Sequence, residues 1–386
     1  MLRESNLALV ARTVCAAASP PSRAGVAERT GMTRSTVSRL VDDLVGGGVL
    51  DELDPAAVVG RGRPATPLVA GAGVVALGLQ VNATYLAATL LDLRGRVVDH
   101  DLRSGDFLAS DPAEALERLG TLSAELLGRM PAGLRLVGAG LALPGIVSAD
   151  TGRLLLAPNL GWSDLDPAGM VDPGAVGGTP LHVGNEASLA ARTVAEAAPG
   201  RRGALRDFVY LSGEIGIGGA AVLDGRVMAG RHGWAGEVGH VCVDPAGPPC
   251  ACGSTGCLEQ YAGRRALLAA AGLPDDADTS VLVALAESGE RQASRAVARA
   301  AGALGVALAG VVNVLDIPAI VLGGHLGQVA DLVRADLERA LGARALSARW
   351  VAPTIVTASG DAAPGATGAA MAELSAVLAD PARWLS

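Results

Sequence analysis

Four side chains of the type that bind metals lie close together in the second half of the chain. They are His240, Cys250, Cys252 and Cys257. Three thiolates and one imidazole suit a closed tetrahedral Zn²⁺ site, and such a site is structural because it leaves no position open for a reactive water. Gly253 and Gly256 let the chain turn around the ion. The sequence therefore predicts a structural zinc site, which constrains how residues 236–259 can fold.

The cysteine pattern favours a metal over disulfide bonds. The chain has five cysteines, an odd number, and four of them lie within sixteen residues. We predict that Cys15 and Cys242, which fall outside the ligand pattern, are ordinary core residues. The sequence contains no lysine, so catalysis by a lysine amine is excluded.

Length and composition indicate a packed α/β protein with more than one domain. The 386 residues suffice for two or three domains of about 150 residues each. Half of the chain is hydrophobic and only 2% is aromatic, which suits layers packed from Ala, Val and Leu and argues against disorder. No apolar stretch stands out as a membrane span. Arg3, Glu4 and Arg12 interrupt the N-terminal apolar positions, so no signal peptide is expected and the cytoplasm is the predicted location.

The charge is unevenly distributed along the chain. Its net value is −8, but residues 1–66 hold eight arginines against seven acidic residues, which leaves −9 on the remainder. A near-neutral head on an acidic body suits a DNA-binding module whose arginines act locally.

The first 50 residues carry the pattern of three helices joined by short turns. We predict a first helix from Asn6 to about Ala18, a second from Ser22 to Thr30 and, after a turn at Gly31, a third that is capped by Thr33. The third has an apolar stripe with helical spacing, formed by Val37, Leu40, Val41, Leu44 and Val45. This order of elements is typical of a helix-turn-helix.

The opposite face of the third predicted helix is polar and basic. Its candidate DNA-contacting residues are Arg34, Ser35, Thr36, Ser38 and Arg39. In a major groove such side chains reach base edges and phosphates. Arg61 and Arg63 alternate with glycines in a stretch that suits a wing entering the minor groove. The alternative is an ordinary three-helix cap with a surface loop.

From about Val74 onward, predicted strands alternate with helices. The strands are 74–79, 85–93, 136–143, 208–212 and 320–322, and the helices are 113–130, 294–315 and one after Gly365. This alternation predicts an α/β body in two lobes. We expect residues 67–73 to be the hinge between a head of residues 1–66 and a body of residues 74–386.

The segment 236–259 resembles the signature of the ROK family, which comprises repressors, open reading frames and sugar kinases. Three further segments also resemble the family: Leu143–Gly145, Pro158–Trp162 and Gly360–Gly368. The head resembles the winged helix of the family's xylose and N-acetylglucosamine repressors, which its kinases lack. The resemblance implies an N-terminal winged helix-turn-helix followed by a two-lobed actin/hexokinase-like fold with a sugar cleft between the lobes.

The resemblance also allows a test for kinase activity, because family kinases share loops that hold ATP. At those positions this chain has Gln80, Asn82, Ala83, Ile215 and Glu186. Glu186 stands where the kinases have their aspartate base and is one methylene longer, and a misplacement of about 1 Å can reduce the rate about a hundredfold. An anionic Glu214 would repel a phosphate, although Gly323-Gly324 matches the adenosine end. The pattern predicts that no catalytic residue remains.

The sugar-contacting positions of the family are better preserved. They correspond to Asn159, Asn185, Glu186, Glu237, His240 and Glu259. Carboxylates and amides suit sugar hydroxyls because they accept or donate hydrogen bonds. Taken singly, each could be a solvated or capping side chain. His240 is predicted to serve both metal and sugar, with one ring nitrogen for each.

We therefore predict a sugar-responsive DNA-binding repressor of carbohydrate-metabolism genes. The resemblance implies a homodimer or homotetramer on double-stranded operator DNA, released when a sugar or sugar derivative closes the cleft. One alternative is an active sugar kinase with an appended head. Another is a constitutive DNA-binding protein whose body serves only for oligomerisation.

Overall fold

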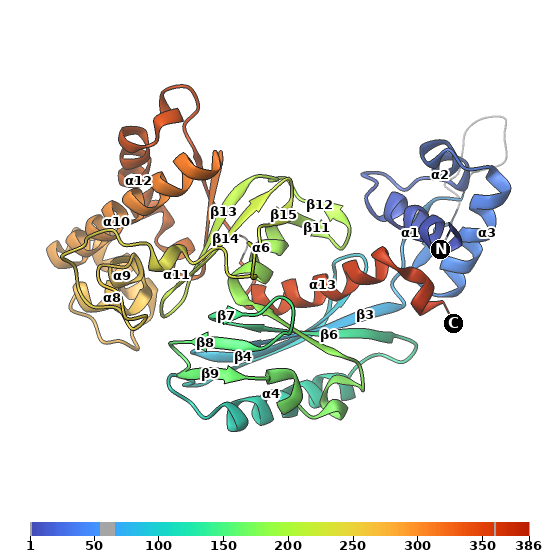
Figure 1. Ribbon diagram of the computed structural model, residues 1–386, viewed down its shortest axis with the longest axis horizontal. Helices are drawn as coiled ribbons and strands as arrows, with labels where there is room; N and C mark the ends of the chain where they lie inside the picture. Colours follow the sequence, from blue (N-terminus) through green and yellow to red (C-terminus); the bar gives the residue numbers. More distant parts are fainter. Residues whose placement is uncertain (1, 55–65, 359, 386) are drawn as a thin grey trace.

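A computed structural model of the chain describes residues 2–54, 66–358 and 360–385. It consists of an N-terminal helical head and two α/β lobes (Figure 1). Near its C-terminus the chain returns to the head. Its last long helix there packs against both the body and the first helix of the chain.

The head contains the three predicted helices. They are α1 (Leu2–Cys15), α2 (Arg23–Thr30) and α3 (Arg34–Gly46). The side chains of Ser22 and Thr33 accept hydrogen bonds from Gly25 N and Thr36 N, so both predicted caps are confirmed. Helix α1 begins earlier than predicted, because no residue before Asn6 breaks a helix. It also ends earlier, at Cys15, ahead of the two prolines that follow.

The predicted hinge is in part a strand of the head. Leu68–Ala70 form β2, which pairs antiparallel with β1 (Leu50–Glu52). Leu68 is fully buried in the core of the head, and this burial holds the segment against the head. The predicted hinge of residues 67–73 is therefore wrong over Leu68–Ala70, which belong to the head. Residues 71–73 connect the head to the body. Arg61 and Arg63, predicted to form the wing, lie outside the described residues.

The N-terminal lobe has a five-stranded sheet in the order β10-β6-β3-β4-β5. Its strands are β3 (Val74–Val81), β4 (Tyr85–Asp92), β5 (Val97–Ser104), β6 (Arg135–Leu143) and β10 (Leu181–Asn185). Helix α4 (Pro112–Gly128) packs on one face and α13 (Pro364–Ala379) on the other. A small sheet of β7 (Ile146–Val147), β8 (Leu154–Ala157) and β9 (Trp162–Leu165) leads toward the second lobe, followed by α5 (Pro167–Met170) and η1 (Pro173–Val176).

The C-terminal lobe repeats this layered plan with the sheet order β15-β14-β13-β16-β17. Its strands are β13 (Phe208–Gly213), β14 (Ile217–Leu223), β15 (Arg226–Val227), β16 (Ala319–Gly323) and β17 (Thr354–Thr357). Helix α6 (Glu186–Ala195) covers one face, while α10 (Arg291–Leu315) and α12 (Ala330–Arg344) cover the other. The remaining elements are β11 (Glu196–Ala198), β12 (Arg201–Arg202), η2 (Val238–His240), α7 (Glu259–Ala262), α8 (Arg264–Ala270), α9 (Thr279–Glu287), α11 (Gly324–Gln328), η3 (Leu346–Arg349) and η4 (Pro381–Trp384).

Helix α10 is long and apolar enough to cross a membrane by length and composition alone. Of its most apolar window, 56% is buried inside the protein. It is the single such helix in the described part of the chain, and a buried core helix passes the same test.

The head is held to the N-terminal lobe by a shared core and by two arginines. Apolar residues of α1 and of the second half of α13 belong to one buried cluster: Leu7, Val10, Val14, Met371, Leu374, Val377 and Leu378. Arg135 of β6 donates to Gly47 O just after α3 (2.8 Å) and to Trp384 O of η4 (2.6 Å). Arg94 binds the Asp51 carboxylate at 2.6 Å. The end of α3 is thereby fixed to the body.

Candidate ligand pocket, metal centre and DNA-facing helix

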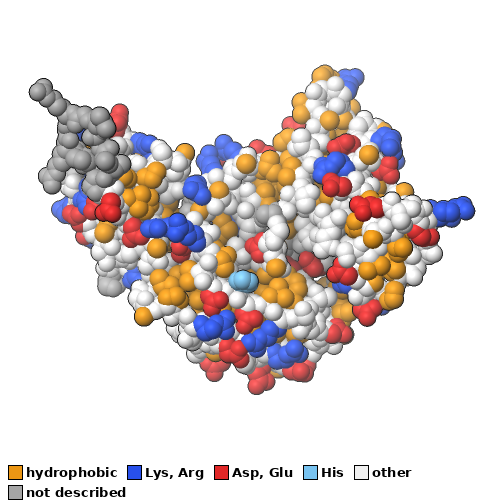
Figure 2. Space-filling model, turned by 180° about the vertical axis from the view of Figure 1, so that it is seen from behind, with side chains coloured by type: hydrophobic (Ala, Val, Ile, Leu, Met, Phe, Trp, Pro, Cys, Tyr) orange, Lys and Arg blue, Asp and Glu red, His pale blue; other side chains and the backbone are white. Residues whose placement is uncertain are grey.

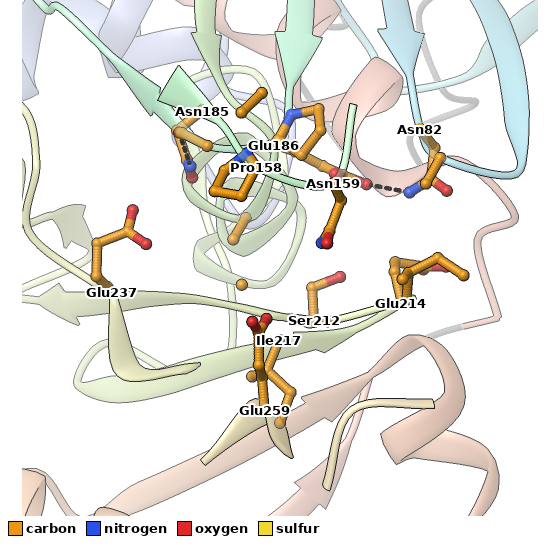
Figure 3. A pocket seen from close by; sticks show the side chains of 18 of the residues that line it. Asn82, Pro158, Asn159, Asn185, Glu186, Ser212, Glu214, Ile217, Glu237 and Glu259 are labelled. Carbon is orange, nitrogen blue, oxygen red and sulfur yellow. Dashed lines mark hydrogen bonds between the residues drawn. The ribbon is translucent and has the colours of Figure 1, made fainter. Parts of the chain in front are cut away.

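A pocket between the two lobes brings the predicted sugar-contacting residues together (Figure 3). All six line it: Asn159, Asn185, Glu186, Glu237, His240 and Glu259. The cavity holds about 730 Å³ of space free of protein atoms, part of it open to solvent. Its lining residues come from both lobes, so a ligand held there would contact both.

One side of the pocket depends on a glycine. A Cβ at Gly216 would lie 2.2 Å from Glu259 Oε2 and 3.1 Å from Asn159 Nδ2. The absence of a side chain at Gly216 leaves room for these two side chains beside the β13–β14 turn, and both point into the cavity from opposite sides (Figure 3). They present one amide and one carboxylate to a ligand.

Asn185 has a structural task in addition to its place in the pocket. Its Oδ1 accepts a hydrogen bond from Ser188 N (2.9 Å) and so caps α6, while its Nδ2 donates to Gly145 O (2.8 Å). Asn185 is therefore a helix-capping residue, which was the alternative to a sugar-contacting role for each residue taken singly. The cap places Glu186 in the first turn of α6, facing the pocket.

Glu186 is held by two amides from β3 and the residue that follows it. Gln80 Nε2 and Asn82 Nδ2 both donate to Glu186 Oε1, at 2.6 Å and 2.8 Å. Glu186 is only 7% exposed, and this burial raises its pKa to about 7, although the two amides act in the opposite direction. The sequence interpretation treated Gln80 and Asn82 only as departures from the kinase pattern and missed this contact.

Glu214 lies in surroundings that disfavour its charged form. Burial, and then the nearby charge of Glu186, raise its pKa to about 8. Burial thus favours the neutral form of this carboxyl, which weakens the repulsion of phosphate that the sequence predicts for it. The two carboxyl groups titrate as a coupled pair.

This pair predicts a pH-dependent stability. A carboxyl whose folded-state pKa is raised holds a proton that the unfolded chain has already released, so the free energy of unfolding falls as pH rises from about 5 to 8. Each pKa unit corresponds to about 1.4 kcal/mol. Between pH 5.5 and 9 we expect Glu186→Gln to flatten this fall by roughly 2 kcal/mol and Glu214→Gln by roughly 3 kcal/mol. Unfolding midpoints from pH 5.5 to 9 test this, and slopes parallel to the wild type's would contradict it.

A second, larger cavity lies beside the pocket and is lined from both lobes. It contains Thr84 and Gly323-Gly324, the positions that resemble the nucleotide site. Its wall has one arginine, Arg264, and six carboxyl groups: Asp106, Glu214, Asp275, Asp276, Asp278 and Asp361. His325 adds no charge, because burial lowers its pKa to about 4. An acidic wall of this kind disfavours a polyphosphate.

The predicted metal ligands form one cluster at the edge of the pocket. The ligand atoms of His240, Cys250, Cys252 and Cys257 lie within 4.8 Å of one another. Cys252 Sγ and Cys257 Sγ are 3.7 Å apart, close to the ~3.8 Å that follows from tetrahedral Zn–S bonds of about 2.3 Å. Gly256, with φ of +66°, places its Cα where a Cβ would strike Asp244 O. The donor set and its spacing fit a metal ion.

His240 connects this cluster to the pocket. Its Nδ1 lies 3.8 Å from Cys250 Sγ, and its Nε2 lies 3.9 Å from Glu237 Oε2. The two ring nitrogens thus face the two sites that the sequence assigned to them. Cys15 is buried as predicted, whereas Cys242 is exposed on the metal loop, so the prediction that it is a core residue is wrong.

Helix α3 presents the predicted DNA-contacting side chains to solvent. Arg34, Ser35 and Arg39 are exposed, while Thr36 and Ser38 are half-buried. The acidic residues at its far end are paired, Asp42 with Arg23 (2.7 Å) and Asp43 with Arg3 (2.9 Å). On the face of the body that Figure 2 shows, acidic and basic side chains are mixed over the N-terminal lobe, and no comparable basic stripe is seen there. A hollow lies between the N-terminal and the C-terminal lobe on this face.

The fold and these sites define a class: a two-lobed, sugar-kinase-like α/β body with a His/Cys₃ cluster beside its interlobe pocket, joined to a helix-turn-helix head. The chain belongs to the ROK family, whose family model matches residues 76–374. The predicted resemblance is confirmed, and so is the fold class.

Similar proteins include both regulators and kinases. A putative xylose repressor of Caldicellulosiruptor sp. (strain Rt8B.4) is 29% identical over 345 residues, covering 85% of each chain. A glucokinase of Halalkalibacterium halodurans is 27% identical and covers 70% of this chain and 86% of its own. A crystal structure of a ROK family transcriptional regulator, a homologue of the E. coli MLC protein, superposes on the whole chain with a TM-score of 0.80, covering 99% of its own length at 23% identity.

Proposed function

We propose that this protein is a sugar-responsive transcriptional repressor of carbohydrate-metabolism genes. The observation that carries the proposal is the joint presence, in one fold, of an exposed recognition helix and an interlobe polar pocket. The similarity to a putative xylose repressor over 85% of both chains supports it. The division into a head of residues 1–66, continued by β2, and a body of residues 74–386 belongs to the same proposal.

The pocket suits an uncharged polyol. Its ionisable side chains are four glutamates and His240, and no arginine of the described residues lines it. The glutamates are Glu186, Glu214, Glu237 and Glu259. Carboxyl groups and the amides of Asn159 and Asn185 can pair with neighbouring hydroxyls of a sugar. A sugar phosphate would enter a site with no positive charge to receive it.

We propose further that kinase activity has been lost. Glu186, at the position of the catalytic base, already accepts two hydrogen bonds, and the neighbouring cavity is acidic. The second candidate is an active sugar kinase with a DNA-binding head. The glucokinase relative and the intact Gly323-Gly324 favour it.

The metal cluster completes the proposal. Zn²⁺ held by His240 and the three cysteines would fix the loop that carries Glu237 and Glu259, and would act structurally because all four positions are filled. In the cytoplasm, a homodimer or homotetramer would place two copies of α3 on a pseudo-palindromic operator. A sugar that closes the pocket would then change their spacing and release the DNA.

A ligand screen on the zinc-loaded protein tests this function. Xylose, glucose, N-acetylmannosamine, glucose 6-phosphate and Mg-ATP are compared by thermal shift and by their effect on the affinity for a duplex selected from random-sequence DNA. We expect a neutral sugar to raise the unfolding temperature and to weaken DNA binding, and the phosphate and Mg-ATP to do neither. A shift with Mg-ATP together with ADP release would support the kinase instead.

A further inference from the structure

Helix α13 runs from strand β3, which carries Gln80, to the core of the head. Its first turn lies against β3, beside Gln80, and its second half packs on α1 (Figure 1). Like β3, α13 contributes side chains to the buried cluster that forms the core of the DNA-binding head. It is therefore placed to connect the two sites.

The first turn of α13 is held at backbone distance from β3. A Cβ at Gly78 would lie 1.8 Å from Ala366 O, and a Cβ at Gly365 would lie 2.8 Å from the side chain of Gln80. A Cβ at Gly368 would lie 1.9 Å from Leu189 O of α6. Such close packing leaves little room for independent motion, so a shift at this end must move the helix.

Gln80 joins α13 to Glu186 directly. Its Oε1 accepts a hydrogen bond from Ala366 N at 2.9 Å, and its Nε2 donates to Glu186 Oε1 at 2.6 Å and to Tyr85 Oη at 2.8 Å. Both amide hydrogens and the carbonyl oxygen are thus in use. Gln80 is fully buried and does not line the pocket, so a ligand can reach it only through Glu186.

Glu186 keeps one oxygen for a ligand. The two amide donors share Oε1, and no described residue donates to Oε2, while the side chain lines the pocket. A sugar hydroxyl that donates to Oε2 stabilises the ionised carboxylate. An ionised acceptor makes the bond from Gln80 shorter and stronger.

We propose that Gln80 is a positioning residue that couples sugar binding to DNA release, by transmitting the state of Glu186 to the first turn of α13. This inference rests on the proposed function. It assigns a role to a residue that the kinase comparison treats as a loss. The family's kinases have an aspartate at this position, and an ionised aspartate could not donate a hydrogen bond to Glu186.

The other end of the connection lies at the recognition helix. Leu374, Val377 and Leu378 of α13 share a buried cluster with α1 and with Leu40 and Leu44 of α3. Arg135 binds Gly47 O, just past α3, and the C-terminal Trp384 O together. A displacement of α13 would therefore change the packing of α3, the proposed recognition helix.

The test measures the ratio of DNA affinities without and with saturating sugar, using the active sugar of the panel and the selected duplex. Allosteric ratios are typically about 5 to 150. In Gln80→Met, which has a similar size but no polar atoms, we expect the ratio to fall to about 1. Sugar binding should be weakened, as in any variant that removes a donor to Glu186, but a thermal shift should still be seen at saturating sugar. The affinity for DNA without sugar should persist, a result that a merely structural role would not give.

Asn82 offers a matched control. It donates to the same Glu186 oxygen but makes no hydrogen bond to α13. Asn82→Leu should weaken sugar binding and yet keep the wild-type ratio once sugar is saturating. Should Gln80→Met not fold, Gln80→Glu replaces it, since it keeps an acceptor for Ala366 N but loses the donor to Glu186.

Two results would overturn this role of Gln80: a wild-type ratio in the Gln80 variants, or an equal loss of the ratio in Asn82→Leu. A wild-type protein whose DNA affinity no sugar of the panel alters is a different failure. It would refute the proposed function itself, together with the inference built on it, and would be seen before any variant is made.

Discussion

Replacing Cys257 with serine is expected to remove the metal and, with it, sugar binding. Cys257 is fully buried and is followed directly by Leu258 and by Glu259, which lines the pocket. Structural zinc contributes about 10–16 kcal/mol to the folding of isolated zinc-finger peptides. Here a large core folds around the loop, so we expect a smaller loss of about 3 kcal/mol, which is a fall of roughly 4 °C in unfolding temperature for a chain of 386 residues.

Metal content and ligand-induced thermal shift measure this effect. The same loop provides the control, since Cys242 is exposed and stands outside the ligand cluster. Cys242→Ser should keep one equivalent of zinc and the sugar response. DNA binding should survive in both variants, because the buried core of the head contains no residue of this loop. A Cys257→Ser protein that still holds one zinc and responds to sugar would rule out this cluster as the metal site.

Local patterns made the metal cluster and the head predictable. His240 and the three cysteines lie within a short loop, so their spacing alone limits how they can meet. The caps at Ser22 and Thr33 act on backbone groups two or three residues away. The apolar stripe of α3 likewise follows from the helical period, and four of its five residues are buried, with Val45 partly so. Features decided within one turn of chain are readable from sequence.

Features decided by packing between distant segments were missed. The bond from Ala366 N to Gln80 joins residues 286 positions apart and exists only because Gly78 and Gly365 let α13 approach β3. Nothing in the neighbourhood of Gln80 in the sequence indicates it. The ionisation of Glu214 depends in the same way on burial between the lobes, which the residue type does not reveal.

The predicted hinge failed for a third reason, because tertiary packing determined the structure against the local composition. Residues 67–73 have the small and apolar composition of a connector, yet Leu68 completes the core of the head and pulls its neighbours into β2. A pairing partner at Leu50–Glu52 was available because an apolar pair follows α3 there. The ends of predicted elements are set by such tertiary contacts rather than by propensity.

The double variant Arg34→Ala/Arg39→Ala is expected to lose most of its DNA affinity. Both side chains are exposed on the face of α3 opposite its buried stripe, and Arg34 is the first residue of the helix, where recognition helices contact base edges. A bidentate arginine–guanine contact contributes about 1–3 kcal/mol. Two such losses predict a fall of about 2–6 kcal/mol, or roughly 30- to 20,000-fold in affinity.

Titration of the selected duplex at several salt concentrations measures this, and the same titration of each single variant separates the two arginines. A base contact that is lost relaxes sequence preference, whereas a lost phosphate contact lowers the salt slope by about one. Arg339→Ala on α12 removes the same charge from an exposed site in the far lobe and should leave DNA binding unchanged. Sugar binding should persist in every variant. If the double variant binds the duplex as tightly as Arg339→Ala does, α3 is not the recognition helix and the DNA-binding surface must be sought elsewhere on the molecule.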